Sequence, residues 1–357
     1  MKKIVGIIGA ALLASSIFAV DFSAGVRLQG SLFNFNDGAV TIFEEHHENQ
    51  FYHKPISFAI SSDRAGGQLK LTDVTAAQVP LKNKDNQEVS PVITDAWSIW
   101  FKPVDALKIT VGRWSTNLNQ EHIGWCNTDS GIETDGYALS LGLDSFSWDL
   151  FLASGDGKWF VTIPKEGDAA VAELYTKFQF GADFGTVNAM FNAINTFKDF
   201  RFGAGLNLAG LPVGLWFNVI GIYAAEDFQR IRVEADVSGN VDSLGYELFL
   251  AGGYNMATNV GAANAFTGVE GWHVGGTYGI AEPEAFVGFY AKLSFPIGNL
   301  GGFVELKDGN VLAKDFNMTI NPGFTANVGG CEIKAGINLT AAKKVVVDVP
   351  VEFAINF

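Results

Sequence analysis

The sequence is poor in cysteine, in positive charge and in helical periodicity. Cys126 and Cys331 are the two cysteines among 357 residues, so disulfides do not hold the fold together. The 24 Lys and Arg residues are outnumbered by 38 Asp and Glu residues, and the net charge of −14 argues against nucleic acid or an anionic lipid surface as a partner. Amphipathic helical spacing is scarce, which argues against a helical bundle.

Several chemical motifs are also absent. The chain has no phosphate-binding glycine loop, no zinc-binding helix and no GxSxG turn, so no catalytic residues, cofactor or metal are predicted. His46 and His47 are adjacent and would point apart on a strand, which favours a hydrated loop over a metal site. A hydrolase stays open as an alternative, with a Ser or Asp near His122 or His273.

The sequence is instead rich in glycine and in two-residue alternation. Gly accounts for 41 residues and Phe for 30, so many turns and many aromatic anchors are expected. In the segment 230–237 the apolar residues alternate with Arg230, Arg232, Glu234 and Asp236. Such alternation predicts a strand with one apolar and one polar face.

Similar strands recur along the chain without a linker, which indicates one all-β unit. Further candidates are 22–28, 97–102, 107–113, 146–152, 174–180, 200–208, 213–219, 285–295 and 333–339. The uncharged segment 203–225 is long enough for a membrane-spanning helix, but Pro212 and its glycines favour a hairpin. About nineteen runs are present, whereas a single-chain barrel needs an even number, so 16 or 18 strands are predicted.

The chain begins with the pattern of a secretory signal peptide. Lys2 and Lys3 precede an apolar stretch and small residues up to Ala19, which predicts cleavage after Ala19. An uncleaved membrane anchor is the alternative. The predicted organisation is a signal peptide over 1–19 and one β-domain over 20–357.

The connections between the strands alternate between long and short as far as about Asn255. Long polar segments, such as 115–136, are followed by short joints such as "PVDA" and "LDS". A secreted β-sandwich or a jelly roll would also sort its strand faces, but it has no reason to treat the two ends differently. The asymmetry therefore predicts an antiparallel transmembrane β-barrel with short periplasmic turns and long external loops.

The last segment, "VVVDVPVEFAINF", is an amphipathic strand that runs to the final residue, Phe357. Together with the signal peptide, the alternating strands and the hairpin-like segment 96–114, it resembles the outer-membrane porin family. The resemblance implies a bacterial outer-membrane location and an assembly signal at Phe353, Ile355 and Phe357. It also implies as partners outer-membrane lipid, the barrel assembly machinery, periplasmic chaperones, small hydrophilic solutes and the other copies of a homo-trimer.

A barrel of this size encloses a water-filled lumen, whose polar wall sets what passes. The predicted pore-lining residues are Arg27, Lys102, Lys108, Arg113, Lys177, Arg201, Arg230, Arg232, Glu234 and Asp236. By the porin resemblance, the loop 115–136 would fold inward and narrow the pore with Glu121, Asp129, Glu133 and Asp135. The "PEFGG" motif of general porins is missing from this loop, so a solvated external loop stays the alternative.

Three further interpretations remain open on the sequence alone. Trp114, Trp125, Trp159 and Trp272 are expected to form an aromatic girdle at the outer membrane surface, with a sugar path as the alternative. A bond between Cys126 and Cys331 is disfavoured because they are predicted at opposite ends of the barrel. The function predicted is a passive diffusion channel for small hydrophilic solutes, and the alternative is a plugged barrel acting as a surface adhesin or structural protein.

Overall fold

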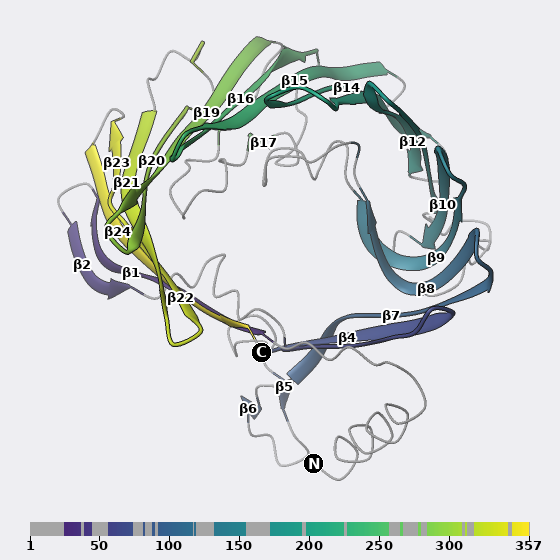
Figure 1. The fold of residues 1–357 in the computed structure, drawn as a ribbon, viewed down its shortest axis with the longest axis horizontal. Helices are drawn as coiled ribbons and strands as arrows, with labels where there is room; N and C mark the ends of the chain where they lie inside the picture. Colours follow the sequence, from purple (N-terminus) through teal and green to yellow (C-terminus); the bar gives the residue numbers. More distant parts are fainter. Residues whose placement is uncertain are drawn as a thin grey trace.

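The computed structural model has an all-β fold, as the alternating sequence predicts. It describes residues 25–36, 39–44, 56–73, 81–82, 88–89, 92–116, 118, 132–154, 172–194, 198–224, 227–256, 265–266, 278–279, 284–308, 311–312, 318–341 and 345–356. Within these ranges twenty strands form one sheet, which curls into the ring of Figure 1. The predicted signal peptide and Phe357 lie outside the described residues.

The strands of this sheet follow one another around the ring in chain order. They are β1 (Gly25–Asn36), β2 (Ala39–Glu44), β3 (Ile56–Ser61), β4 (Ala65–Asp73), β7 (Val92–Val104), β8 (Leu107–Thr116), β9 (Ile132–Gly142), β10 (Phe146–Ser154), β11 (Ala172–Ala182), β12 (Gly185–Ile194), β13 (Asp199–Leu208), β14 (Gly214–Ala224), β15 (Asp227–Val241), β16 (Leu244–Asn255), β19 (Glu284–Ile297), β20 (Leu300–Asp308), β21 (Met318–Val328), β22 (Cys331–Gly336), β23 (Asn338–Ala341) and β24 (Val345–Asn356).

Two small hairpins lie outside this sheet. They are β5 (Leu81–Lys82) with β6 (Glu88–Val89), and β17 (Ala265–Phe266) with β18 (Tyr278–Gly279). In the view of Figure 1, β17 projects within the ring. Both hairpins belong to connections at the same end of the barrel.

Two of the crossings are made by interrupted strands, and this resolves the predicted strand number. β22 and β23 lie in line, because both pair with β21 on one side and with β24 on the other. β2 runs antiparallel to β1, and β3 runs antiparallel to β4, so β2 and β3 are two parts of one descending crossing. Counted this way, the twenty described strands make eighteen crossings, within the predicted choice of 16 or 18.

The first and last strands join the two ends of the chain. β1 pairs antiparallel with β24 from Gly25 opposite Asn356 to Phe35 opposite Val347. On its other side β1 pairs with β2 and also contacts β3. The backbone hydrogen-bonding edge of the final strand is therefore paired with the first strand, as a transmembrane barrel requires.

One end of the barrel carries only tight connections. The turns at 62–64, 105–106, 143–145, 183–184, 242–243, 298–299 and 329–330 join neighbouring strands directly, and 209–213 is the longest of them. Asp242 adopts a left-handed backbone conformation, with φ of 53°, in the turn between β15 and β16. Asp tolerates this conformation better than most residues, and two-residue hairpins with the right twist require it.

The opposite end carries the long connections, with exceptions that the sequence did not indicate. The connections 74–91, 117–131, 155–171 and 256–283 are long, whereas 195–198, 225–226 and 342–344 are as short as turns. The predicted rhythm thus breaks earlier than Asn255. The loop predicted at 115–136 is shorter than expected, because β8 extends to Thr116 and β9 begins at Ile132.

The structure decides the helix-or-hairpin alternative for the segment 203–225. The segment 203–225 forms parts of β13 and β14 with the turn 209–213 between them, so the hairpin interpretation is correct and the spanning helix is wrong. Further along the chain, the described residues 318–330 form a single strand, β21, followed by the Gly329–Gly330 turn. In the described part of the chain, no helix is long and apolar enough to span a membrane.

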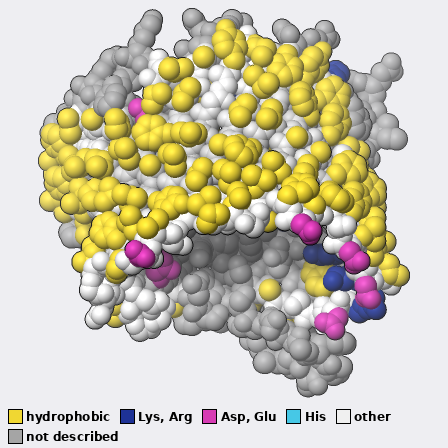
Figure 2. Space-filling view, turned by 45° about the horizontal axis from the view of Figure 1, so that its top comes forward, with side chains coloured by type: hydrophobic (Ala, Val, Ile, Leu, Met, Phe, Trp, Pro, Cys, Tyr) yellow, Lys and Arg dark blue, Asp and Glu magenta, His cyan; other side chains and the backbone are white. Residues whose placement is uncertain are grey.

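The outward face of the sheet is apolar. On β15, Ile231 and Val233 are exposed while Arg232 and Glu234 between and beside them are buried. The same sorting exposes Leu139, Phe178, Phe191, Phe217, Leu250, Val287, Ile320, Leu339 and Phe353 on other strands. On the face that Figure 2 shows, hydrophobic side chains form a broad surface, and most of the charged side chains in view lie along the lower rim. Slipping β15 by one residue would place two arginines in lipid at about 2–4 kcal/mol each.

Candidate functional site: the inner wall of the barrel

The most charged strand of the inner wall is β15. Arg230, Arg232, Glu234 and Asp236 occupy alternate positions on it, and all four are buried. Arg232 Nε lies 2.7 Å from Glu234 Oε1, and Asn218 on β14 donates a hydrogen bond of 3.2 Å from Nδ2 to Glu234 Oε2. Glu234 thus joins two strands, because both of its carboxylate oxygens have partners.

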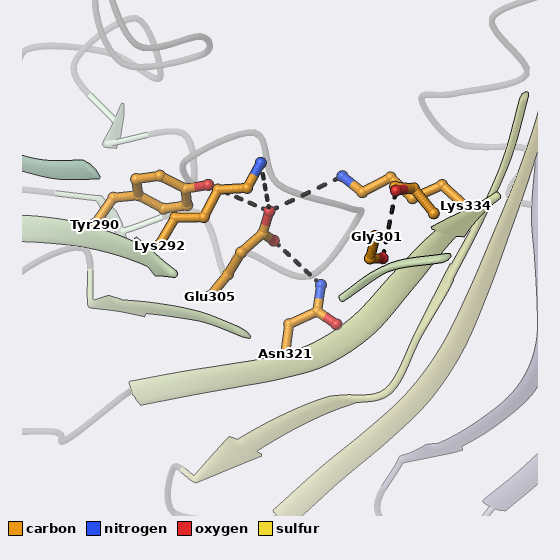
Figure 3. Close-up of polar contacts among 7 residues, drawn as sticks. Tyr290, Lys292, Gly301, Glu305, Asn321 and Lys334 are labelled. Atoms are coloured by element: carbon orange, nitrogen blue, oxygen red, sulfur yellow. Dashed lines mark hydrogen bonds and ion pairs between the residues drawn. The ribbon is translucent and has the colours of Figure 1, made fainter. Parts of the chain in front are cut away.

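A second polar centre surrounds Glu305 on β20 (Figure 3). Tyr290 on β19 donates a hydrogen bond of 3.2 Å from its hydroxyl to Glu305 Oε1, and Asn321 on β21 donates one of 3.2 Å from Nδ2 to Glu305 Oε2. The ammonium groups of Lys292 and Lys334 lie 3.7 and 3.9 Å from the same Oε1. The buried carboxylate of Glu305 therefore links side chains from four strands and lies close to two ammonium groups.

The two lysines of this centre remain partly open to solvent. Their side chains are 31% and 19% exposed, whereas that of Glu305 is 4% exposed. Lys292 Nζ lies 5.9 Å and Lys334 Nζ 5.0 Å from the centre of the Phe303 ring, within the range of cation–π attraction. The charge that this centre presents to the lumen is therefore positive, with its balancing carboxylate behind it.

A similar arrangement occupies β7 and β8. Lys102 Nζ and Lys108 Nζ lie 5.9 and 5.1 Å from the centre of the Trp100 ring. The ring covers Gly66 on β4, where a Cβ atom would meet the indole at 2.6 Å. Glycine at this position is what lets the indole lie flat against the wall, so that both lysines can pack on it.

Burial of the inner wall changes along the barrel axis. Inward residues close to the short-turn end, such as Lys108, Asp149 and Lys334, are partly exposed. Those further along their strands, such as Glu234 and Asp348, are fully buried. Accessible charge is therefore present on the inner wall near the short-turn end, and Arg201 near the opposite end is partly exposed as well.

One arc of the inner wall is apolar rather than charged. Leu118, Ala138, Phe151, Ala153, Tyr175, Met190 and Ile220 form a buried cluster against which Trp114 packs. The Trp114 ring stacks on Phe151 at 4.9 Å and meets Tyr175 edge-on at 5.7 Å. The girdle interpretation of Trp114 is therefore wrong: its ring lies on the inner side of the wall with Phe151 and Tyr175. Trp125, Trp159 and Trp272 lie outside the described residues.

The remaining predicted lumen residues are placed as follows. Lys177 lies opposite Met190, and Arg201 lies opposite Asn192, so both share a face with buried inner-wall residues. Arg27 lies opposite Ala354 in the β1–β24 ladder. Arg113 lies on the face of β8 opposite to that of Trp114.

The predicted constriction residues divide into two groups. Glu121 and Asp129 lie outside the described residues. Glu133 and Asp135 belong to β9 instead of the loop, opposite Ser115 and Arg113. This corrects the loop assignment of both residues. The register brings Asp135 next to a predicted lumen arginine.

The centre around Glu305 was not predicted from the sequence. Its signal was present, because Phe303, Glu305 and Lys307 alternate with Val304 and Leu306 in the same way as the residues of β15 do. What the sequence does not contain is the pairing of four strands that brings Tyr290, Lys292, Asn321 and Lys334 to one carboxylate. Cys331, at the start of β22, is a free thiol. Cys126 and the two adjacent histidines lie outside the described residues.

Comparisons with known proteins identify the class of fold. A scan against protein-family models and a search of curated proteins both find no match. Among solved structures, a BenF-like porin from Pseudomonas fluorescens Pf-5 matches with a TM-score of 0.55 at 8% identity, over 95% of this chain and 98% of that one. OpdL of Pseudomonas aeruginosa matches with 0.54 at 9% identity, over 95% and 98%.

A third structure, OccAB4 of Acinetobacter baumannii, matches with a TM-score of 0.53 at 10% identity, over 94% of this chain and 97% of that one. These likenesses extend over nearly the whole length of both partners in each case. They show that the chain has the fold of outer-membrane porins, an antiparallel transmembrane β-barrel.

Proposed function

We propose that this protein is a channel of the bacterial outer membrane that lets small hydrophilic solutes or ions diffuse passively. The observation that carries the proposal is the sorting of side chains across the wall of a porin-type barrel. Apolar side chains cover the outer face, whereas Arg232, Glu234 and Glu305 lie on the inner face. Charge on the inner face is what an aqueous path needs, and charge on the lipid face is costly.

The barrel size also supports a channel. Eight-stranded barrels are filled by their own side chains, whereas barrels of sixteen to eighteen strands have room for an aqueous path. The eighteen crossings of this sheet belong to the second group. OpdK of Pseudomonas aeruginosa, a structural neighbour with a TM-score of 0.50, was solved with vanillate, a small organic anion. A solute of that size class is consistent with the proposed path.

The wall offers both signs of charge to a passing solute. Lys292, Lys334, Lys102 and Lys108 are partly exposed, and so is Asp149. We expect the predicted lumen residues Lys177 and Arg201 to contribute to the same path. Selectivity would then depend on which of these side chains is most accessible.

Planar-bilayer recording tests the proposal. The protein without residues 1–19 is refolded in detergent and added to a bilayer under a gradient of potassium chloride. Discrete conductance steps are expected, and the sign of the reversal potential identifies the preferred ion. Protein that is folded, as judged by its heat-dependent electrophoretic mobility, but passes no current would overturn the channel function.

A further inference from the structure

The ladder between β24 and the line formed by β22 and β23 is interrupted near the middle of β24. It runs up to Ala335 opposite Val351 and resumes with Asn338 opposite Asp348. The gap spans two residues on both strands, so the register is unchanged and no residue has been inserted. The interruption therefore has a chemical cause at this level and is not a slip of one strand.

Proline supplies that cause on both sides of the gap. Pro350 of β24 takes the position opposite Gly336, and Pro322 of β21 takes the position opposite Ile337. Ile337 donates its N–H to the Pro322 carbonyl at 3.0 Å, but Pro322 has no N–H to return. Because successive residues of a strand direct their backbone groups to opposite neighbours, Gly336 faces Pro350, which has no N–H either. Two successive carbonyl groups of the wall therefore receive no ladder hydrogen bond from the proline that each of them faces.

The next ladder, between β24 and β1, is irregular at the same level. Ser31 lies opposite Pro350 and Phe33 lies opposite Val349, so Leu32 is an extra residue and forms a β-bulge. A bulge bends its strand and leaves one residue out of the ladder. The register shift between β14 and β15, by contrast, affects a single ladder. Here three neighbouring ladders are interrupted at one level, from β21 through β22, β23 and β24 to β1.

This line of interruptions, the crease, lies near mid-depth of the membrane. It passes through Pro322, Ile337, Pro350 and Leu32. Pro350 is the sixth of the twelve residues of β24, and a transmembrane strand needs about 9–11 residues to cross. Backbone groups find no water in the hydrocarbon region, so a missing ladder hydrogen bond weakens the wall more here than at its rims. Proline is rare in the interior of a sheet for the same reason.

The wall on either side of the crease is well connected. On the outer side, Asn338 donates a hydrogen bond of 3.3 Å to Asp348, and the hydroxyl oxygens of Thr319 and Thr340 lie 2.8 Å apart. On the short-turn side, the ladders of β22 with β21 and with β24 are continuous over 331–335. Two firmly paired parts of the wall therefore meet along a line where the backbone connection is weak.

We infer that the crease is a hinge in the barrel wall, about which the outer part of β23 and β24 moves relative to the part near the short turns. Hinges are short segments that absorb a change in backbone angles while the parts on either side stay rigid. The moving part carries Asn338 and Asp348 on its inner face, so the motion changes the width of the outer lumen. This inference goes beyond the proposed channel function and does not depend on it.

Hydrogen exchange followed by mass spectrometry tests the weakness of the crease in the refolded wild-type barrel. Peptides that cover 333–341 and 347–353 span the crease, whereas peptides that cover 203–208 and 215–220 span the uninterrupted β13–β14 ladder. The crease peptides should exchange at least about tenfold faster, because amides exchange through local opening of the structure. Equal exchange in the two regions would overturn the hinge.

Replacing the prolines tests the cause of the weakness. Pro322→Ala and Pro350→Ala each return an N–H to the ladder, and the double variant should slow exchange at the crease about tenfold. Pro296→Ala, in β19 opposite Gly301 and next to a short turn, is the matched control and should leave exchange at the crease unchanged. A double variant that folds but exchanges as fast as the wild type would also overturn the hinge.

Spin-label distances distinguish a hinge from local fraying. In a background with Cys126→Ser and Cys331→Ser, one label is placed at Val219 on the outer face of β14. The second label is placed at Leu339, on the outer side of the crease, or at Ile333, on its short-turn side. The distance distribution to position 339 should be at least about twofold broader than the one to position 333.

The combined outcomes decide the inference without any measurement of current. Fast exchange at the crease together with a broad distribution to position 339 supports the hinge. Fast exchange with two equally narrow distributions would overturn it, since the ladder would then fray without moving the wall. Neither measurement requires ion flow, so a folded barrel that passes no current would overturn the channel function and leave this test intact.

Discussion

Arg232 and Glu234 occupy neighbouring inward positions on β15 and form an ion pair, with 2.7 Å between Nε and Oε1. Both side chains are almost fully buried, at 2% and 0% exposure. A buried pair adds little net stability, but removing one partner leaves the other charge without part of its compensation. The pair therefore makes this part of the wall sensitive to changes that an exposed strand would tolerate.

The first prediction concerns the stability of this wall. Glu234→Gln keeps the shape of the side chain but removes the charge that faces Arg232 and the acceptor for one Asn218 hydrogen bond. We expect the free energy of unfolding to fall by about 3 kcal/mol, the low end for breaking a buried pair. Urea unfolding followed by tryptophan fluorescence measures this change.

The matched control for Glu234→Gln is Glu332→Gln, the same substitution at an exposed residue near the start of β22. It should change the free energy of unfolding by less than about 0.5 kcal/mol. Equal losses in the two variants would show that the Arg232–Glu234 pair has no special role.

The second prediction concerns ion selectivity. Glu305→Gln removes the carboxylate that faces Lys292 and Lys334 and leaves both partly exposed ammonium groups in place. We expect the reversal potential in a salt gradient to shift towards anions, because the local charge becomes more positive by one unit. Glu305→Asp keeps the charge and should retain the wild-type sign. A reversal potential that is the same in Gln and Asp variants would place the ion path elsewhere.

The alternation on each strand let the fold and the inward face of β15 be predicted, but not the contacts between side chains of different strands. Within each strand, the alternation of apolar and polar residues shows which face meets lipid. The all-β barrel and the β13–β14 hairpin could therefore be predicted from short stretches of sequence. The strand number required knowing that β2 and β3 share one crossing, which depends on the partners of each segment. The sequences of β2 and β3 do not by themselves show which strands they pair with.

Trp114 shows why the site was harder to predict than the fold. Its position at the end of a strand is typical of a girdle residue, whereas its ring packs on Phe151 and Tyr175, which belong to other strands. The same apolar cluster contains Leu118, whose side chain lies against Gly203, a residue 85 positions further along the chain. The cluster around Glu305 has the same origin, since it needs side chains from four strands.

The third prediction concerns the lipid-facing surface. Val233 lies on the exposed face of β15 between the buried Arg232 and Glu234. Val233→Arg should lower the free energy of unfolding in lipid by about 2–4 kcal/mol, the cost of a cation near the middle of a bilayer. Val233→Phe should be tolerated because it keeps the surface apolar. Equal folding yields of the two variants in vesicles would contradict the assignment of this face to lipid.

The last prediction concerns the final strand. Phe353 lies on the outward face of β24 and is 43% exposed, opposite Leu28 of β1 and Ile333 of β22. The porin resemblance suggests that Phe353, Ile355 and Phe357 are read during assembly, and an apolar outward row is also what the bilayer requires of this strand. We expect Phe353→Asp to reduce folded protein in the outer membrane by about tenfold or more, since it places a carboxylate on the lipid face.

The control for Phe353→Asp is Glu352→Gln, on the adjacent inward position of the same strand. It changes charge by one unit as well but leaves the outward row intact, so its yield of folded, heat-modifiable protein should match the wild type. To separate assembly from stability, both variants are also refolded in detergent, where no assembly machinery is present. A Phe353→Asp protein that refolds normally in detergent but fails in cells places the defect in assembly or insertion, and normal cellular yield would contradict the role of this row.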